Sequence, residues 1–314
     1  MKYVLAGALL ATVSIGASAQ EATFTTGLAT EINPGLFDCG PKSRTSAVGE
    51  ITSDDGTVWT VPAATNYGLV PFASDLFNEC GGNQLGSLEE LDLNSVPVLD
   101  AGGDEEFIAY IFADNYFELH VNGRLIAVDE VPFTKFNSNV VRFKAARPVT
   151  LAVMMVDWEE NLGLGSEDNR GKAFHPGDGG LVAHIQDANG ATVAITDDSW
   201  RAQTFYTSPL NDRGCIVFSG QSRDSSACSV EGVDDARGYS AAHWVVPSDW
   251  MMPAFDDTDW PNAVTFTNDT VGVKNKKAFT NFEDVFDTPG ADADFIWSSN
   301  LVLDNLVLLR KTIE

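Results

Sequence analysis

The segment Asp157-Trp158-Glu159 combines side-chain types that proteins use to bind sugars. A tryptophan ring can stack on the apolar face of a sugar, and neighbouring carboxylates can accept hydrogen bonds from its hydroxyl groups. His175 and Asp178 follow in a glycine-rich stretch that is typical of a loop. The sequence therefore predicts a ligand-binding site at Asp157, Trp158, Glu159, His175 and Asp178. The alternative is that Trp158 caps the core at the end of its strand.

A calcium site is a second interpretation of this region. Asp157, Glu159 and Asn161 alternate as the first oxygen ligands of a calcium loop do. Leu162 stands where an EF-hand requires glycine, so the EF-hand interpretation fails. A site of another type remains a prediction, with calcium as the candidate cofactor. Its candidate ligands are Glu159, Asn161, Glu167 and Asp168.

The sequence contains no recognisable catalytic constellation. The nucleophile motif Gly-x-Ser-x-Gly, a glycine-rich phosphate loop with lysine, and the zinc motif His-Glu-x-x-His are all absent. With 45 acidic residues, some pair always lies at the separation that glycoside hydrolysis needs, so a carboxylate pair carries no information here. We therefore predict a protein that is not an enzyme, and keep a polysaccharide hydrolase as an alternative.

The chain begins with the features of a secretory signal. Lys2 supplies a positive end, residues 4–15 form a short apolar run, and Ala17-Ser18-Ala19 offers the small side chains that a signal peptidase accepts. The apolar run is too short and too rich in small residues for a membrane span. We predict cleavage after Ala19 and a secreted protein, periplasmic or extracellular, without a membrane span.

The chain has four cysteines, and each lies nearest in sequence to one other: Cys39 to Cys80, and Cys215 to Cys228. Other pairings are open, but the local one is the simplest. The spacing contains no Cys-x-x-Cys pair, which disfavours a zinc site. Disulfides form in oxidising compartments, so the prediction of two local disulfides agrees with the prediction that the chain is exported.

Acidic residues outnumber basic ones by 45 to 19, and the formal net charge is -26. Such a chain repels phosphate backbones and anionic lipids, which disfavours nucleic acid and membrane as partners, and it attracts cations such as calcium. Solubility is the simpler explanation of the acidity. The partner that we predict is an extracellular glycan or a surface protein.

Short runs of apolar or alternating residues recur along the chain, and they are typical of strands. The clearest lie at residues 107–112, 116–121, 140–143, 149–156, 180–186, 191–195 and 295–310. Asn122-Gly123 and Asn189-Gly190 each separate two such runs and predict hairpins, because Asn-Gly suits a tight turn. Only residues 74–79 and 85–93 have a helical pattern, and both segments are short.

Residues 113–124, which read Ala-Asp-Asn-Tyr-Phe-Glu-Leu-His-Val-Asn-Gly-Arg, resemble a strand and turn of the galactose-binding-like jelly rolls, which include sugar-binding domains appended to many glycoside hydrolases. The resemblance continues through residues 149–157, 179–183, 196–200 and 255–260. It implies a jelly roll whose end loops bind carbohydrate, often with a structural calcium ion. Because folding motifs carry it, the resemblance bears on fold more than on function.

These patterns together predict an all-β fold, a galactose-binding-like jelly-roll β-sandwich with short helical turns. The predicted organisation is a signal peptide at residues 1–19, an amino-terminal extension at residues 20–99 packed on the sandwich, and the sandwich itself at residues 100–314. The leading functional hypothesis is a secreted carbohydrate-binding protein that is assisted by calcium. An extracellular structural, adhesion or surface-assembly protein is the second hypothesis, and a polysaccharide hydrolase the third.

Overall fold

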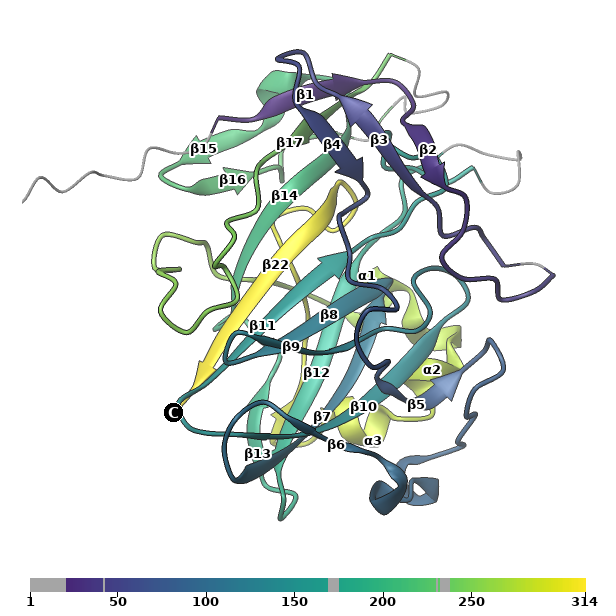
Figure 1. Ribbon diagram of the computed structural model, residues 1–314, viewed down its shortest axis with the longest axis vertical. Helices are drawn as coiled ribbons and strands as arrows, with labels where there is room; N and C mark the ends of the chain where they lie inside the picture. The colour runs from purple at the N-terminus through teal and green to yellow at the C-terminus, as the bar shows by residue number, and fades with distance from the viewer. Residues whose placement is uncertain (1–20, 42, 169–174, 230, 232–237) are drawn as a thin grey trace, which may run out of the picture.

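Two large, mainly antiparallel β-sheets pack face to face in the computed structural model, which describes residues 21–41, 43–168, 175–229, 231 and 238–314 (Figure 1). The seven-stranded sheet has the order β1 (Thr23–Thr26), β17 (Ser240–His243), β14 (Arg201–Leu210), β22 (Asp304–Ile313), β11 (Val149–Val156), β8 (Tyr116–Val121) and β9 (Arg124–Val128). The eight-stranded sheet has the order β18 (Val264–Phe266), β21 (Phe295–Trp297), β12 (Gly180–Asp187), β7 (Glu105–Asp114), β10 (Asn137–Ala145) and β5 (Ser74–Asn78). In this second sheet β13 (Thr192–Ile195) also pairs with β12, and β6 (Val98–Asp100) with β10.

Smaller elements complete the part of the chain that the structure describes. One small sheet contains β2 (Thr30–Asn33), β3 (Val48–Thr52) and β4 (Val58–Val61). Two hairpins are formed by β15 (Val217–Ser219) with β16 (Ser222–Asp224), and by β19 (Asp287–Thr288) with β20 (Ala291–Asp292). The short helices are α1 (Asn268–Val271), α2 (Lys277–Thr280) and α3 (Glu283–Phe286), with 3₁₀ turns at Leu88–Glu90, Leu93–Ser95, Arg213–Cys215 and Val273–Asn275. The prediction of an all-β sandwich with short helical turns is confirmed.

The chain passes repeatedly from one large sheet to the other. It runs from β7 in the eight-stranded sheet to β8 and β9 in the seven-stranded sheet, returns to β10, and then crosses to β11 and back to β12. Such alternation is the connection pattern of a jelly roll. The amino-terminal residues join the same sheets, because β1 is an edge strand of the first sheet and β5 and β6 belong to the second.

The predicted signal at residues 1–19 lies outside the described residues. Among the helices of the described ranges, none is long and apolar enough to cross a membrane.

The seven-stranded sheet is buried on both faces. Three side chains of β11 belong to the core between the two large sheets: Leu151, Val153 and Met155. The alternate three belong to a second core on the other face: Ala152, Met154 and Val156. Since successive side chains of a strand point to opposite faces, a strand covered on both sides reads as an unbroken apolar run.

The second core is closed by the amino-terminal sheet and by tryptophans from later loops. Val48, Ile51 and Val61 come from β3 and β4, and they pack in the same cluster as the seven-stranded sheet. The tryptophans of this cluster are Trp158, Trp244, Trp250 and Trp260. Trp200 is buried in the core between the large sheets. Trp200 and Trp260 are therefore packing residues.

The predicted Asn-Gly hairpins are both present. Asn122 and Gly123 have φ angles of 49° and 82°, and they join β8 to β9 with Val121 opposite Arg124. Asn189-Gly190 joins β12 to β13, and Gly190 has a φ of 81°. Both residues of the first turn have the positive φ that asparagine and glycine tolerate best, whereas in the second turn only Gly190 has it.

Both predicted disulfides are also confirmed. The Cα atoms of Cys39 and Cys80 lie 5.0 Å apart, and those of Cys215 and Cys228 lie 5.1 Å apart. The second disulfide closes a loop that contains the β15–β16 hairpin.

The helical predictions were partly wrong. Residues 74–79 contain strand β5, because Leu76 and Phe77 are buried and the segment pairs with β10. Residues 85–93 contain only a 3₁₀ turn. The helices α1 to α3 were missed because four residues are too few to show a period, and tertiary packing of Phe279 and Phe286 holds them in place.

Replacement of Leu309 in the buried strand β22 tests the core between the two large sheets. Leu309 is 0 % exposed, so Leu309→Ala should lower the free energy of unfolding by roughly 3 kcal/mol, measured by urea denaturation. The matched control is Leu69→Ala, since Leu69 is 76 % exposed, and it should change stability by less than about 0.5 kcal/mol. Equal losses in the two variants would contradict the assignment of this core.

Candidate functional site

An open pocket with a volume of about 880 Å³ lies among loops that extend from the two large sheets. Its walls are the segment before β12, the loop that joins β21 to β22, the residues that follow β16, and the start of α1. The polar lining includes Glu167, His175, Asp178, Ser299 and Asn300. The apolar lining includes Phe266, Leu301 and Val302. The size and the mixed lining are those of a small-ligand site.

The structure divides the predicted ligand-binding residues between two places. His175 and Asp178 line the pocket, together with Glu167, which was predicted as a metal ligand. Asp157 and Glu159 are buried, with exposed fractions of 2 % and 3 %, and both lie against Gly177 of the pocket wall.

Trp158 cannot take the predicted role of a sugar-stacking surface. Its side chain is 0 % exposed, its indole Nε1 donates to the carbonyl oxygen of Ala47 at 3.0 Å, and its ring packs edge-on against Tyr116. The alternative interpretation, in which Trp158 caps the core, describes this position. Among the lining residues Phe266 supplies an aromatic ring, and it is half-buried.

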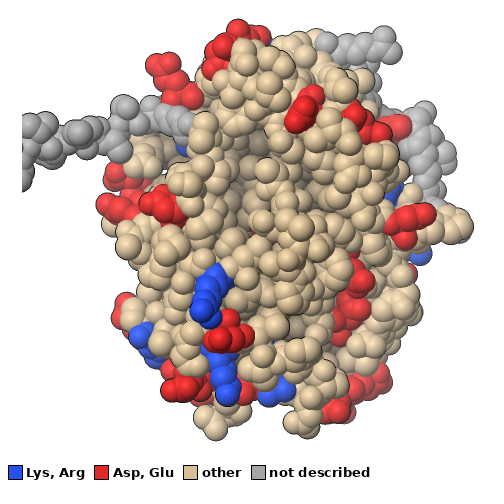
Figure 2. Space-filling view, in the orientation of Figure 1, with Lys and Arg blue, Asp and Glu red and all other residues tan. Residues whose placement is uncertain are grey.

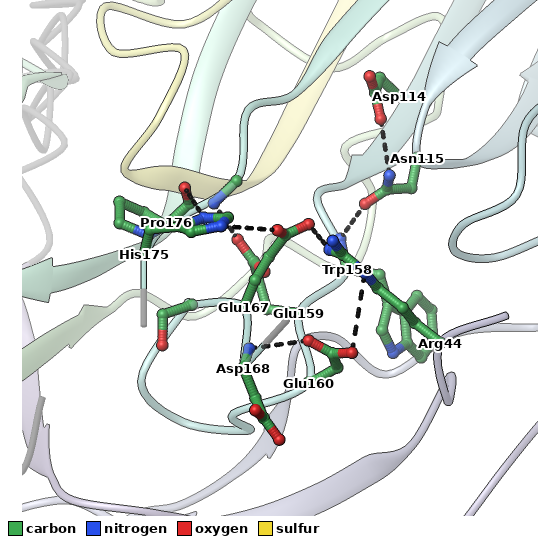
Figure 3. A network of polar contacts seen from close by, with 12 residues as sticks. Arg44, Asp114, Asn115, Trp158, Glu159, Glu160, Glu167, Asp168, His175 and Pro176 are labelled. Carbon is green, nitrogen blue, oxygen red and sulfur yellow. Dashed lines mark hydrogen bonds and ion pairs between the residues drawn. The ribbon is translucent and has the colours of Figure 1, made fainter. Parts of the chain in front are cut away.

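Arg44 holds one side of the pocket in place (Figure 3). Its guanidinium group pairs with the carboxylates of Glu167 and Glu160 and lies over the ring of Phe133. His175 Nε2 lies 3.4 Å from the other oxygen of Glu167. Because Arg44 comes from the amino-terminal segment, that segment fixes the orientation of a pocket carboxylate.

A chain of hydrogen bonds leads from Lys276 to the backbone beside the acidic residues. Figure 3 shows the part from Asp114 through Asn115 to Trp158. Lys276 Nζ lies 3.1 Å from Asp114 Oδ2, and Asn115 Nδ2 donates to Asp114 Oδ1 at 2.7 Å. Asn115 Oδ1 accepts from the backbone N–H of Trp158 at 2.6 Å. Burial raises the pKa of Asp114, and the positive charge of Lys276 opposes that shift. Lys276 therefore supplies the countercharge for Asp114.

Asp157 and Glu159 are a pair of buried carboxyl groups on which the charges of Lys276 and Arg44 act, although these cations form their salt bridges with other carboxylates. One oxygen of each, Asp157 Oδ2 and Glu159 Oε2, has no hydrogen-bond partner among the described residues. Burial raises the pKa of both groups well above their usual values, and the charge of Glu159 raises the pKa of Asp157 further. The other oxygen of Glu159 accepts from the backbone N–H of Gly177, where a Cβ atom would lie 2.7 Å from that oxygen. Only glycine lets the pocket wall approach this carboxylate so closely.

Asp178 is the pocket carboxyl group whose pKa differs most clearly from its usual value. Burial raises its pKa to about 6, and the negative charge of Asp114 contributes to the shift. Asp178 therefore changes charge in the mildly acidic range, where it can serve as a hydrogen-bond acceptor or as an acid.

The four predicted metal ligands do not converge on one point. Glu159 and Asn161 line a small cavity beside Asp157, whereas Glu167 lines the large pocket. The backbone N–H of Asp168 donates to Glu160 Oε2 at 2.8 Å. Across the described ranges, no three or more His, Cys, Asp or Glu side chains form a group that could hold a metal ion.

Sequence reasoning missed the residues that reach the site from distant segments. Arg44, Asp114 and Lys276 lie in the amino-terminal segment, at the end of β7 and just before α2. Asp114 was part of the family-like motif, so a signal for it existed. Arg44 and Lys276 had none, because their roles arise only from the folded positions of their partners.

Comparison with protein-family models, with curated proteins and with solved structures finds no match.

Loss of the Arg44 side-chain charge should destabilise the protein. Arg44→Gln removes the positive charge that pairs with Glu160 and Glu167 in a partly buried setting, so the free energy of unfolding should fall by about 2 kcal/mol. The control is Arg124→Gln, which breaks an exposed pair with Asp100 and should cost less than about 0.5 kcal/mol. Chemical denaturation at neutral pH measures both values. A loss at Arg44 no larger than at Arg124 would show that this contact does not hold the loop.

Proposed function

We propose that the chain is a secreted, non-enzymatic protein that binds carbohydrate in the pocket bordered by Glu167, His175, Asp178 and Asn300. The observation that carries the proposal is the mixed lining of the pocket. Glu167, Asp178 and Asn300 offer acceptors for sugar hydroxyl groups, while Phe266 and Leu301 offer apolar contact for the ring face. This combination suits a ligand whose edge is polar and whose faces are apolar.

The charge around the pocket favours a neutral or cationic sugar over an anionic one. None of the described residues that line the pocket is lysine or arginine. The whole chain has a formal net charge of -26, and Figure 2 shows acidic side chains spread around the rim of the displayed face. Among the described lining residues, a sulfated, phosphorylated or uronic-acid ligand would meet the carboxyl groups of Glu167 and Asp178 and no lysine or arginine. A neutral glycan or an amino sugar is therefore the proposed class.

Two features support export as part of this proposal. Residues 1–19 have the sequence pattern of a signal peptide, and both disulfides are of the kind that persists in oxidising compartments. The disulfide partner Cys228 also lines the pocket. An oxidising compartment would therefore stabilise the ligand site as well as the fold.

Asp178 should control the affinity for the glycan and its dependence on pH. A glycan array at pH 7 identifies the ligand, and titration calorimetry at pH 5 and pH 7 then measures its dissociation constant. Because the carboxylate is the stronger acceptor and its pKa is about 6, binding should strengthen as the pH rises from 5 to 7. Asp178→Asn should weaken binding at pH 7 by about tenfold or more and flatten this pH dependence.

The control for this experiment is Asp256→Asn, a change at an exposed turn where Asp256 accepts from Thr258. It should leave both affinity and pH dependence unchanged. Failure of the wild-type protein to bind any glycan on the array would remove the proposal, and unchanged binding by Asp178→Asn would move the site away from this pocket.

Hydrolysis of a polysaccharide is a second candidate function, favoured by one observation. Asp178 has the raised pKa that a general acid needs, and Glu167 lies in the same pocket. Glu167 is held by Arg44 and lies 3.4 Å from His175, which fixes its carboxylate in the pocket. In this function the same two side chains would act on a glycosidic bond instead of only holding the sugar.

Release of reducing ends from the glycans that bind on the array separates the two functions. The binding proposal expects none above a buffer control between pH 4 and pH 8. A hydrolase would release them with a rate that falls above about pH 6, as Asp178 loses its proton, and Asp178→Asn would abolish the release.

A further inference from the structure

The small cavity beside the pocket has the composition of a cation site. It is lined by Asp157, Glu159 and Asn161, by Tyr206 and Pro62, and by the loop residues Leu162, Gly163 and Gly165. The space open to the centre of a water molecule is about 10 Å³. That is close to the least volume that one water requires, so the cavity has room for one small occupant.

The electrostatics of the cavity require a positive occupant or a proton. Asp157 and Glu159 are both more than nine-tenths buried, and each has an oxygen without a hydrogen-bond partner among the described residues. The nearby cations already serve other carboxylates, since Lys276 pairs with Asp114, and Arg44 pairs with Glu160 and Glu167. The charges of Lys276 and Arg44 offset the burial of Asp157 and Glu159 only in part. Two buried carboxylates that form no salt bridge among the described residues are strongly unfavourable.

We propose that this cavity binds one calcium ion, with Asp157, Glu159 and Asn161 as its side-chain ligands. The ion would neutralise both carboxylates at once and occupy their unpartnered oxygens. The remaining ligands would be backbone carbonyl groups of the lining residues Gly163 and Gly165, because calcium accepts carboxylate, amide and carbonyl oxygens in irregular arrangements.

The same geometry favours calcium over magnesium. Magnesium is smaller, requires near-octahedral ligands and retains several of its waters, whereas the cavity has space for only one occupant of that size. The set differs from the ligands predicted from sequence, because Asp157 joins Glu159 and Asn161 while Glu167 and Asp168 are not part of the cavity lining.

Calcium titration of the mature chain tests the proposal. After treatment with a chelator and its removal, calorimetry should show one calcium ion bound per chain. Saturating calcium should raise the melting temperature by about 5 °C, and magnesium at the same concentration should have little effect. Asp157→Asn and Glu159→Gln should each weaken calcium binding by at least about tenfold.

Both variants keep the size of the side chain and remove one buried charge, so the calcium-free protein should remain folded, as circular dichroism will check. Glu159→Gln also keeps the oxygen that accepts from Gly177. Asp256→Asn is the control, since Asp256 lies in an exposed turn and its loss should leave calcium binding unchanged.

Two outcomes would overturn the proposal. If the wild-type chain binds no calcium and its melting temperature does not respond, the cavity holds a water and the carboxyl pair shares a proton. If Asp157→Asn and Glu159→Gln bind calcium as tightly as the wild-type chain, the ion binds elsewhere. No glycan is used in this titration, so neither outcome bears on the carbohydrate proposal.

Discussion

The two-sided burial of the seven-stranded sheet is the constraint on which the rest of the structure depends. A strand covered on both faces has no solvent to satisfy its polar side chains, so each must find a partner inside the protein. Glu118 on β8 is 0 % exposed, and it accepts hydrogen bonds from Tyr116 and Asn66. Arg310 on β22 is almost as deeply buried and donates to Asp257 Oδ2 at 2.6 Å. The amino-terminal segment and the tryptophan-bearing loops are thus structural necessities, because they cover the second face.

Hydrogen bonds to this sheet hold the loops of the candidate site in place. Asp304, the first residue of β22, accepts from the hydroxyl groups of Thr207, Ser225 and Ser298 at distances of 2.7, 2.8 and 2.6 Å. These three residues belong to β14 and to two of the loops that border the pocket. One buried carboxylate therefore ties the walls of the pocket to the central strands. Sites supported in this way keep their geometry before a ligand arrives.

Features that depend on a few consecutive residues could be predicted from the sequence, whereas features that depend on contacts between distant segments could not. Apolar runs predicted the strands at residues 149–156 and 180–186, and Asn122-Gly123 predicted its hairpin, because each signal lies within a few consecutive residues. Helices α1 to α3 gave no signal, because packing and not periodicity forms them. Trp158 was misassigned as a ligand contact because the local sequence, a tryptophan between acidic residues, does not distinguish an exposed tryptophan from a buried one. The pocket carboxylates could be named from sequence, but their positions follow from Arg44 and Lys276, which lie far away along the chain.

The place of β22 in the sheet also bears on when the protein can fold. This strand follows all the others in sequence, yet it lies between β14 and β11 in the middle of the seven-stranded sheet, and β1 pairs with β17. The sheet therefore cannot close while residues 304–313 are still being synthesised. A nascent chain therefore lacks the centre of this sheet until residues 304–313 have been synthesised, because β22 bridges β14 and β11. Such dependence on long-range pairing is typical of β-sandwiches.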